Sequence, residues 1–545
     1  MSRAIEELLA AVEPGSPRPL LDLVERLRAG DQVAAAGGGH VAGAASSGSR
    51  LGIAIAGLAF DSRAVRPGHL FIAVPGEHAD GHDYVARAAA AGAAAALVER
   101  VVLGVSLPQV LVRSTRRALA TAAAWWYGDP SRSLGVVGIT GTDGKTTTSF
   151  LAVAALEAAG IATGLIGTVD TQIGRVRAAN DVHATTPEAP TVQAMLRAMV
   201  DAGDAAAVVE TTSHGLAQER VAEVAYDVAI LTNLTHEHLE FHRTFDAYLA
   251  AKRSLFERLA VGSASPAKPT PGWPRSGIVN LDDPSAPAFI GAARLAGARV
   301  LTYGTDVAAD VRAIAIEEDR RRLRVRFEAP GGAGTLDLRL AGRFNAHNAL
   351  AVVALGEALS LDPAAIRAGL ESVEAVPGRM QRVEAGQPFG VIVDYAHTPA
   401  ALTAALDLLG PLAAASGGGV IAVFGSAGER DTAKRPMMGR VAGERCRLVV
   451  VTDEDPRTED REAILDQIAA GAERVGRRRG TDLLLIADRG EAIQAAMERA
   501  RPGDVLLLAG KGHETSIIGP TGARPWDEVA EARRALALLG YGDGR

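Results

Sequence analysis

Residues 135 to 148 combine the chemical groups that can hold a polyphosphate. The apolar run 134–140 predicts a buried strand, and residues 146–159 predict a helix. Glycines between the two segments leave backbone N–H groups open toward a phosphate at the N-terminus of that helix. Lys145 adds a positive charge, and Thr146 adds a hydroxyl that can bind Mg²⁺. The sequence therefore predicts a strand, a phosphate loop and a helix in succession.

The spacing of the glycines indicates a particular form of this loop. The usual P-loop has glycine at the position of Ile139, whereas here the glycines fall at 138, 141 and 144. The resulting Gly-Ile-Thr-Gly-Thr-x-Gly-Lys-Thr pattern resembles the ATP loop of the Mur ligase and folylpolyglutamate synthetase superfamily. Asp143 departs from the family loop, which usually has asparagine there, and a carboxylate beside a polyphosphate is unfavourable unless it faces Mg²⁺ or solvent. The ATP contacts that the resemblance implies in this loop are Gly141, Thr142, Asp143, Gly144, Lys145, Thr146 and Thr147.

The composition narrows the class of protein. A chain of 545 residues with 48% hydrophobic and only 4% aromatic residues predicts about three α/β domains packed on alanine, valine and leucine. The net charge of −7 gives no reason to expect nucleic acid or an anionic membrane as a partner. The single cysteine, Cys446, excludes an internal disulfide and fits a reducing compartment. Neither a membrane-length apolar stretch nor a signal-peptide pattern occurs, so we expect a cytoplasmic protein.

Changes of residue character divide the chain into three α/β domains and an N-terminal extension. Residues 1–50 read as an extension and linker, to which we assign no function. Residues 51–132 predict a small α/β domain, residues 133–377 a central P-loop-type domain with a parallel sheet, and residues 378–545 a doubly wound, Rossmann-like domain. The resemblance implies that the first domain binds UDP, the central one is an ATPase domain and the last one binds an amino acid.

Two apolar segments of the central domain, 205–210 and 225–233, end in polar residues that can bind a metal. Ligands of open parallel sheets collect at the carboxyl ends of strands, and phosphoryl transfer needs Mg²⁺ with oxygen or imidazole ligands. Glu210 and His238 follow these segments and resemble the family's metal-binding residues. A zinc site is the alternative, although no cysteine or HExxH motif accompanies its histidines. Those histidines are His236, His238 and His242.

Lys252 lies on a predicted helix, 245–259, whose apolar residues recur at helical spacing. Spacing alone predicts a solvated cation at this position. The segment Tyr248-Leu-Ala-Ala-Lys252, however, resembles the family segment whose lysine carries a carbamate, which could coordinate a second Mg²⁺. The resemblance implies that the catalytic residues are Lys145, Glu210, His238 and Lys252, and that the metal ligands are Thr146, Glu210, His238 and Lys252 as its carbamate.

Other motifs in family order imply contacts to the nucleotides and the substrate. The loop Asp61-Ser62-Arg63 resembles the loop that contacts the uridine nucleotide; the alternative is a turn stabilised by Asp61 and Ser62. The implied contacts to the UDP-linked muramoyl peptide are Ser62, Thr185, Thr186, Ser213, Gln218 and Arg220. The implied contacts on the adenosine side of ATP are Asn345, Asn348, Arg379 and Asp394.

In the last domain, residues 453–457 resemble the specificity motif of Mur ligases that add the third peptide residue. Diaminopimelate enzymes have Asp-Asn-Pro-Arg there, whereas here Glu454 and Asp455 replace the first two residues. Arg457 can hold a distal carboxylate in a bidentate manner, while Asp455 would suit a distal ammonium. The site therefore fits diaminopimelate and leaves lysine and ornithine open; Arg457 could also be a surface arginine in a charged loop. The implied amino-acid contacts are Arg430, Glu454, Asp455, Pro456, Arg457, Gly510 and Glu514.

These motifs together predict an ATP-dependent amide ligase. By resemblance, it joins a diamino acid to UDP-N-acetylmuramoyl-L-Ala-D-Glu through an acyl phosphate, with ATP and Mg²⁺ as cofactors and as a monomer. A folylpolyglutamate synthetase is an alternative, but that family lacks the predicted UDP-binding domain. A catalytically inactive, nucleotide-dependent binding protein is the other alternative, and the intact residues Lys145, Glu210, His238 and Lys252 argue against it.

Overall fold

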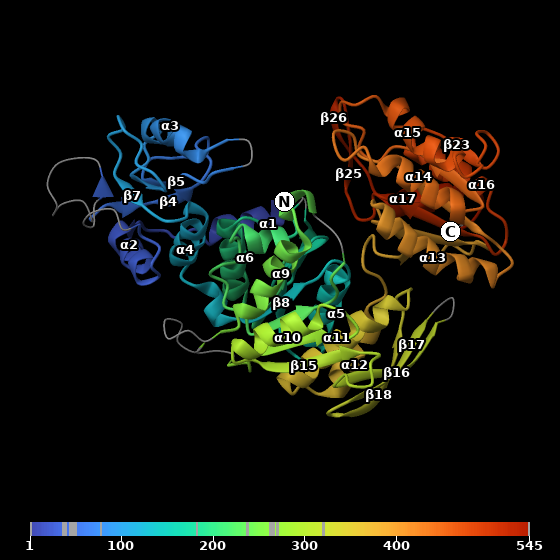
Figure 1. Ribbon diagram of the computed structural model, residues 1–545, viewed down its shortest axis with the longest axis horizontal. Helices are drawn as coiled ribbons and strands as arrows, with labels where there is room; N and C mark the ends of the chain where they lie inside the picture. Colours follow the sequence, from blue (N-terminus) through green and yellow to red (C-terminus); the bar gives the residue numbers. More distant parts are fainter. Residues whose placement is uncertain are drawn as a thin grey trace. The chain divides into compact units, whose positions relative to one another are not determined.

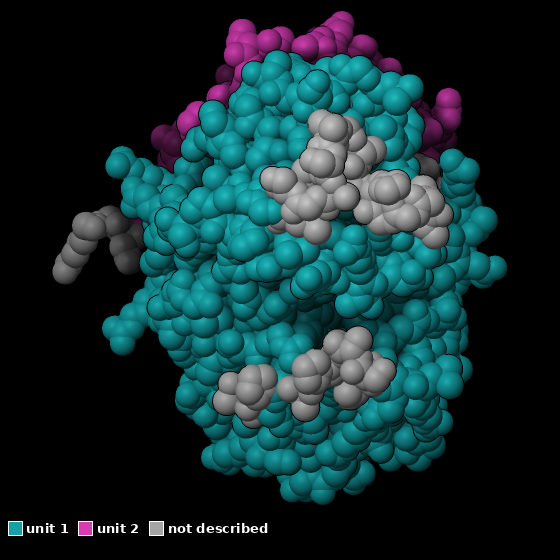
Figure 2. All heavy atoms as spheres, turned by 90° about the vertical axis from the view of Figure 1, so that its left-hand side faces the viewer, with its two compact units in different colours: residues 1–314, 327–334, 347–370 teal, residues 315–326, 335–346, 371–545 magenta. Residues whose placement is uncertain are grey.

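The computed structural model describes residues 3–34, 41–42, 52–76, 79–180, 184–235, 239–260, 268, 272–318 and 322–542. The chain divides into two compact units, coloured separately in Figure 2. The first unit holds residues 1–314, 327–334 and 347–370, and the second holds residues 315–326, 335–346 and 371–545.

A five-stranded sheet forms the first part of the first unit, in the order β2-β7-β6-β5-β4. Its strands from β4 to β7 are parallel, and β2 pairs antiparallel with β7. Alternating side chains bury both faces: α3 packs on one face, while α2 and α4 pack on the other (Figure 1). The elements are β2 (Val41–Ala42), β4 (Gly57–Ala59), β5 (His69–Ile72), η1 (Gly81–Tyr84), α3 (Val85–Ala90), β6 (Ala95–Val98), β7 (Gln109–Leu111), α4 (Thr115–Tyr127) and η2 (Pro130–Ser133).

The first 34 residues contribute to two hydrophobic cores. Helix α1 (Arg3–Ala11) buries Ile5 against Met195 and Met199 of the central part. Strand β1 (Arg18–Pro19) pairs with β3 (Ala54–Ile55), and α2 (Leu20–Ala29) packs its leucines against the small sheet. The segment predicted as an extension is therefore folded into the first unit over its described helices.

The central sheet of the first unit places the phosphate loop at its middle. Strand β8 lies between β12 and β13, and the parallel strands run in the order β9-β12-β8-β13-β14-β15, with β10 and β11 added antiparallel beside β9. The loops after β8, β9, β12 and β13 consequently leave the same edge of the sheet. The strands are β8 (Gly135–Thr140), β9 (Thr163–Ile166), β10 (Asp170–Ile173), β11 (Val176–Ala179), β12 (Ala206–Glu210), β13 (Val228–Leu231), β14 (Ser276–Asn280) and β15 (Arg299–Gly304).

Helices cover both faces of this sheet (Figure 1). Helices α6, α9 and α10 share one apolar core with alternate side chains of the strands, whereas α5 packs on β8, β9 and β12. The helices are α5 (Lys145–Ala158), α6 (Ala189–Ala202), α7 (Ser213–Ala217), α8 (Leu239–His242), α9 (Phe245–Glu257), α10 (Ala286–Leu295), α11 (Phe344–Leu359) and α12 (Pro363–Ser372). Three further strands have residues in both units: β16 (Val311–Glu318), β17 (Leu323–Ala329) and β18 (Gly332–Leu338).

The second unit contains a doubly wound sheet in the order β19-β20-β24-β21-β22-β23, parallel from β20 to β23. Helices α13, α14 and α15 cover one face, and α16 and α17 cover the other. The elements are β19 (Gln381–Arg382), β20 (Gly390–Asp394), α13 (Pro399–Ala414), β21 (Val420–Phe424), α14 (Lys434–Arg445), β22 (Leu448–Val451), α15 (Arg461–Glu473), β23 (Leu483–Leu485), α16 (Arg489–Glu498), β24 (Val505–Ala509), β25 (Ser516–Gly519), β26 (Gly522–Pro525) and α17 (Glu528–Leu538).

Cys446 lies in the core of this second sheet. The residue follows α14, and its thiol is buried with Val420, Val449 and Leu483. Burial raises the pKa of the thiol to about 12, so the thiolate is disfavoured at neutral pH. Its position in the core fits a structural role for this cysteine.

The predicted α/β class is confirmed, with parallel sheets in the central and last parts of the chain. No helix among the described residues is long and apolar enough to cross a membrane.

Candidate active site

The phosphate loop joins β8 to α5 through two glycines whose backbone has positive φ. Gly141 has φ +150°, and a Cβ there would lie 1.8 Å from Thr232 Oγ1. Gly144 has φ +82°, and a Cβ there would lie 2.5 Å from Asn348 Oδ1. Both positions therefore need glycine for conformation and for space. The loop directs the N-terminus of α5 at the carboxyl edge of the sheet, as anion binding requires.

The side chains of this loop lie as follows. Lys145 Nζ donates hydrogen bonds to the carbonyls of Gly141 at 2.9 Å and Thr142 at 2.7 Å. Asp143 is exposed, which meets the condition under which its carboxylate is tolerated near a polyphosphate. Thr147 is buried on the first turn of α5.

Glu210 ends β12 beside this loop and is fully buried, with 0% exposure. Its Oε2 accepts hydrogen bonds from Thr146 Oγ1 at 3.0 Å and from Thr168 Oγ1 at 2.7 Å, while Oε1 accepts from the Thr168 backbone N–H at 3.1 Å. Carboxylate and hydroxyl oxygens are hard donors of the kind that Mg²⁺ prefers. The predicted ligands Thr146 and Glu210 therefore stand together.

The structure describes only one of the three histidines considered as metal ligands. His238 and His236 lie outside the described residues, so their predicted roles remain predictions. His242 is described, with its ring centroid 5.3 Å from that of Tyr248. Among the residues that the structure describes, no group of three or more His, Cys, Asp or Glu side chains could hold a metal ion.

Lys252 is not the solvated cation that its spacing alone predicts. The residue is 2% exposed on α9, and its Nζ donates to Gly141 O at 2.6 Å. The ammonium also lies 4.6 Å from the ring centroid of Tyr248, whose hydroxyl is 3.0 Å from Thr142 Oγ1. The buried lysine thus reaches the phosphate loop directly, and its catalytic role as a carbamate stays a prediction.

The residues predicted to hold the muramoyl peptide gather beside Glu210. Thr186 Oγ1 donates to the Glu210 carbonyl at 2.8 Å, and Thr185 Oγ1 lies at hydrogen-bond distance, 2.9 Å, from Thr168 Oγ1. Arg220 donates to Thr186 O at 2.8 Å. Ser213 begins α7 nearby; its buried Oγ has no hydrogen-bond partner among the described residues, which leaves it available to a ligand.

The remaining substrate and nucleotide positions are more dispersed. Ser62 is buried in the loop after β4, where Arg63 hydrogen-bonds Asp61 and holds the pKa of that carboxyl at about 2. Asn348 accepts from Thr148 Oγ1 at 3.2 Å beside the phosphate loop. The other three predicted adenosine contacts, Asn345, Arg379 and Asp394, lie in the second unit.

Within the second unit, Asp394 binds the residue that follows Arg379. Asp394 ends β20 and accepts hydrogen bonds from the backbone N–H groups of Met380 at 2.8 Å and Ala396 at 2.9 Å. The Arg379 guanidinium carbon lies 4.9 Å from the ring centroid of Tyr395. Asn345 donates to Ala341 O at 2.6 Å.

The predicted amino-acid pocket is organised by a lysine. Lys511 is 0% exposed, and its Nζ pairs with Asp455 Oδ1 at 2.8 Å and Glu514 Oε2 at 2.6 Å. Asp455 Oδ1 also accepts from the Ile518 N–H at 2.9 Å. Both carboxylates thus share a cation supplied by the protein itself.

The neighbours of this cluster leave charged groups available to a ligand. Glu454 Oε2 is buried and has no hydrogen-bond partner among the described residues, and it faces Gly510, which has φ +103°. The Arg457 guanidinium forms no ion pair within the described residues, and its buried Nε has no partner there. Burial raises the pKa of Glu514, as do Asp455 and Glu454. Arg430 is exposed, and Pro456 adjoins Gly428.

Three functional candidates were not predicted from the sequence. Thr168 hydrogen-bonds Glu210 and carries no local signal, whereas Lys511, which pairs with Asp455, lies between the predicted contacts Gly510 and Glu514. Ser426 follows β21, and its buried Oγ has no hydrogen-bond partner among the described residues. The polar residues at the carboxyl ends of β9 and β21 were the one signal that could have indicated Thr168 and Ser426.

Sequence profiles of three Mur ligase domains match the chain. They are the Mur ligase family catalytic domain at residues 54–127, the Mur ligase middle domain at residues 139–356 and the Mur ligase glutamate ligase domain at residues 378–512. With the phosphate loop and the three sheets described above, they show that this chain belongs to the Mur ligase family.

Individual relatives match nearly the whole chain. A UDP-N-acetylmuramyl-tripeptide synthetase of Roseiflexus sp. (strain RS-1) is 52% identical over 90% of this chain and 96% of its own. A UDP-N-acetylmuramoyl-L-alanyl-D-glutamate–2,6-diaminopimelate ligase of Geobacter metallireducens is 41% identical over 91% of this chain and 97% of its own. A solved structure of a ligase with that same name has a TM-score of 0.64 at 29% identity, over 91% of this chain and 98% of its own.

Proposed function

We propose that this protein adds the third peptide residue to UDP-N-acetylmuramoyl-L-Ala-D-Glu in peptidoglycan precursor synthesis, using ATP. The observation that carries the proposal is the grouping of Glu210, Thr146 and Lys252 around the phosphate loop, beside the predicted substrate residues. The names of relatives that match over about nine-tenths of the chain support the same reaction.

The arrangement can activate a carboxylate and then form an amide. ATP transfers its terminal phosphoryl group to the D-glutamyl carboxylate, which gives an acyl phosphate and ADP. The amine of the incoming residue then attacks the acyl carbon; the C–N bond forms, the C–O bond to phosphate breaks and the amine loses a proton. The N-terminus of α5 and Lys145 stabilise the negative charge on the transferred group.

Mg²⁺ fits the oxygen atoms of this site. The carboxylate of Glu210 and the hydroxyl of Thr146 would hold it, with His238 and carbamylated Lys252 as further ligands that the family resemblance implies. When bound, Mg²⁺ supplies positive charge beside the ATP phosphates. Thr168 keeps the Glu210 carboxylate oriented toward Thr146 through two hydrogen bonds.

We propose meso-diaminopimelate as the third residue. Its distal end carries both an ammonium and a carboxylate, and the pocket offers groups of both signs, Glu454 and Arg457. Asp455 would select a distal ammonium if its charge were free, but Lys511 already pairs with it. Lysine and ornithine, which lack the distal carboxylate, would leave Arg457 without a partner.

The test is ADP release by the purified protein with UDP-N-acetylmuramoyl-L-Ala-D-Glu and, separately, meso-diaminopimelate, L-lysine and L-ornithine. We expect turnover with diaminopimelate at least about tenfold more efficient than with the others, because loss of a bidentate charge pair costs about 1.4 kcal/mol or more. A preference for lysine or ornithine would overturn the choice of residue. No turnover with any of the three would overturn the ligase itself.

We also propose that the enzyme acts as a cytoplasmic monomer, without a nucleic-acid or membrane partner. The net charge of −7 supports the absence of an anionic partner.

A further inference from the structure

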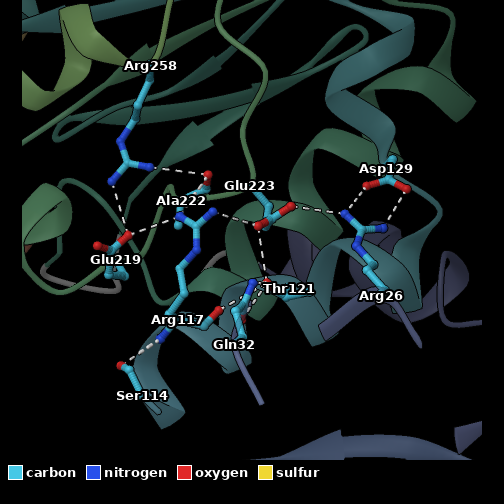
Figure 3. A network of polar contacts seen from close by, with 10 residues as sticks. All are labelled: Arg26, Gln32, Ser114, Arg117, Thr121, Asp129, Glu219, Ala222, Glu223 and Arg258. Atoms are coloured by element: carbon cyan, nitrogen blue, oxygen red, sulfur yellow. Dashed lines mark hydrogen bonds and ion pairs between the residues drawn. The ribbon is translucent and has the colours of Figure 1, made fainter. Parts of the chain in front are cut away.

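A network of charged side chains joins the small sheet's helices to the segment that precedes β13 (Figure 3). Arg26 of α2 and Arg117 of α4 come from one side, and Glu219 and Glu223 come from the other. Arg258, just after α9, approaches the same segment. All these residues belong to the first unit.

Each of the two glutamates of this network is held by two arginines. Glu219 Oε2 accepts from Arg117 at 3.3 Å and from Arg258 at 3.1 Å. Glu223 accepts from Arg117 at 3.0 Å on Oε1 and from Arg26 at 3.0 Å on Oε2. Arg26 in turn forms a bidentate pair with Asp129, at 2.7 and 2.8 Å.

Two neutral contacts complete the network. Thr121 Oγ1 donates to Glu223 Oε1 at 3.1 Å and accepts from Gln32 Nε2 at 2.9 Å. Arg117 and Arg258 both donate to the carbonyl of Ala222. Figure 3 shows these side chains converging on the segment 219–223 from opposite sides.

Glu219 has an unusual backbone conformation and lies between two predicted substrate contacts. Its φ is +57°, a left-handed conformation that non-glycine residues adopt at a cost, and it lies between Gln218 and Arg220. Those two neighbours are the predicted contacts of the muramoyl peptide, and Arg220 donates to the carbonyl of Thr186 beside Glu210. A fixed Glu219 therefore constrains the backbone from which both neighbouring side chains leave, while Arg220 is also held by its ion pair with Glu188.

We infer that Glu219 and Glu223, held by Arg26, Arg117 and Arg258, are positioning residues that set the distance between the two halves of the UDP-linked substrate site. The inference rests on the proposed function. The nucleotide end of the substrate would bind at Ser62, in the small domain, and the peptide end at Ser213 and Arg220, in the central part. A substrate that spans two sites gains affinity only if their separation matches its length.

The partial exposure of these charged side chains indicates that the network orients the substrate site more than it stabilises the fold. Its side chains are partly exposed, and exposed ion pairs contribute little to the free energy of folding. Ion pairs fix geometry more effectively than they stabilise, because each guanidinium restricts the direction of the carboxylate it binds. The network also gives a role to Arg26 and Gln32, which belong to the segment predicted as an extension.

The test compares Arg117→Gln with Arg113→Gln in the full chain. Arg113 pairs with the exposed Asp31 and serves as a matched control outside the network. Calorimetric titration measures the Kd of UDP alone and of UDP-N-acetylmuramoyl-L-Ala-D-Glu, and the ADP assay gives the KM of ATP. Thermal melting reports folding.

We expect Arg117→Gln to weaken binding of the whole substrate about tenfold while the Kd of UDP and the KM of ATP stay within about twofold. Glu219→Gln should act in the same direction, Arg117→Lys less strongly, and Arg113→Gln not at all. Equal weakening of UDP and whole substrate, or unchanged substrate binding in both network variants, would overturn the inference. Lack of turnover by the wild-type protein would instead overturn the proposed function.

Discussion

At the scale of single residues, the amino-acid pocket shows how a local substitution can be compensated at a distance. Asp455 replaces the asparagine of diaminopimelate enzymes and, alone, would change the charge of the pocket. Lys511 cancels that charge through an ion pair across 56 positions of the sequence. The substitution therefore does not by itself indicate a different third residue.

This pairing predicts opposite outcomes for two substitutions. Asp455→Asn should leave the ratio of kcat/KM for diaminopimelate over lysine within about threefold, because asparagine still accepts hydrogen bonds from Lys511 and Ile518. Lys511→Met should shift that ratio toward lysine by about tenfold, equal to about 1.4 kcal/mol, because two carboxylates lose their cation. The measurement is steady-state ADP release with both amino acids.

A large shift in Asp455→Asn would show that Asp455 contacts the substrate directly and would contradict this account. Thermal melting of both variants is needed beside the kinetics. Removing one partner of a buried ion pair can cost about 3–5 kcal/mol of stability, so Lys511→Met must be compared at a temperature at which it is folded.

At the scale of elements, the phosphate loop requires glycine for two separable reasons. Gly144→Ala adds a Cβ 2.5 Å from Asn348 Oδ1 and also strains a backbone at φ +82°. Gly160, at the other end of α5, has φ +80° with nothing within 4 Å of its Cβ position. Alanine at either position would therefore strain the backbone, but only alanine at 144 would also clash with a neighbouring side chain.

We expect Gly144→Ala to raise the KM of ATP at least tenfold and Gly160→Ala to leave it unchanged. Both should lose about 1–2 kcal/mol of stability from the left-handed backbone. Equal KM values for the two variants would mean that the space beside Asn348 does not matter for nucleotide binding. ATP titration of ADP release and thermal melting provide the two readouts.

A second prediction at this scale concerns acid stability of the loop after β21. Buried Arg435 of α14 holds Glu459 with two hydrogen bonds, at 2.6 and 2.8 Å, and donates to Ala427 O in that loop. The hydrogen bond from Arg435 lowers the pKa of Glu459 from 4.5 to about 2. The stabilisation from this carboxylate is therefore complete above pH 4.5 and lost as the pH falls toward 2.

Glu459→Gln should consequently be less stable than wild type at pH 7, and the difference should narrow between pH 4.5 and 2. Melting temperatures at pH 7 and pH 3 measure this narrowing. Glu462→Gln, an exposed carboxylate on the first turn of α15, is the control and should show no such dependence. A constant difference across this range would show that Glu459 titrates normally.

At the scale of the whole molecule, regular elements were predictable and long-range pairs were not. In the last domain, the apolar runs 391–394, 420–424, 448–452, 482–486 and 504–509 predict strands that agree with β20 to β24 to within about one residue at each end. They are predictable because buried parallel strands are continuous apolar runs. The predicted helix 146–159 agrees with α5 to within one residue at each end. Strands β10, β11 and β16 to β18 were not predicted, because polar and charged residues interrupt their apolar runs.

In the candidate site, too, some residues were predictable from the sequence and others were not. Residues that follow apolar strands, such as Glu210, were predicted because topology gathers them at one edge. Their partners, such as Thr168, come from separate loops and become neighbours only after the sheet has formed. The networks around Lys511 and Glu219 belong to this second class, because charge pairing over long sequence separations has no local pattern.

The buried thiol of Cys446 can report on the opening of the second sheet. A reagent can modify this thiol only when the second sheet opens, because the side chain is enclosed in the core and its pKa is raised to about 12. Since the chain has one cysteine, the rate of labelling records a single process without background from other thiols. The labelling rate of Cys446 should therefore be measured with and without diaminopimelate. A slower rate with the amino acid would show that its binding reduces the opening of the second sheet.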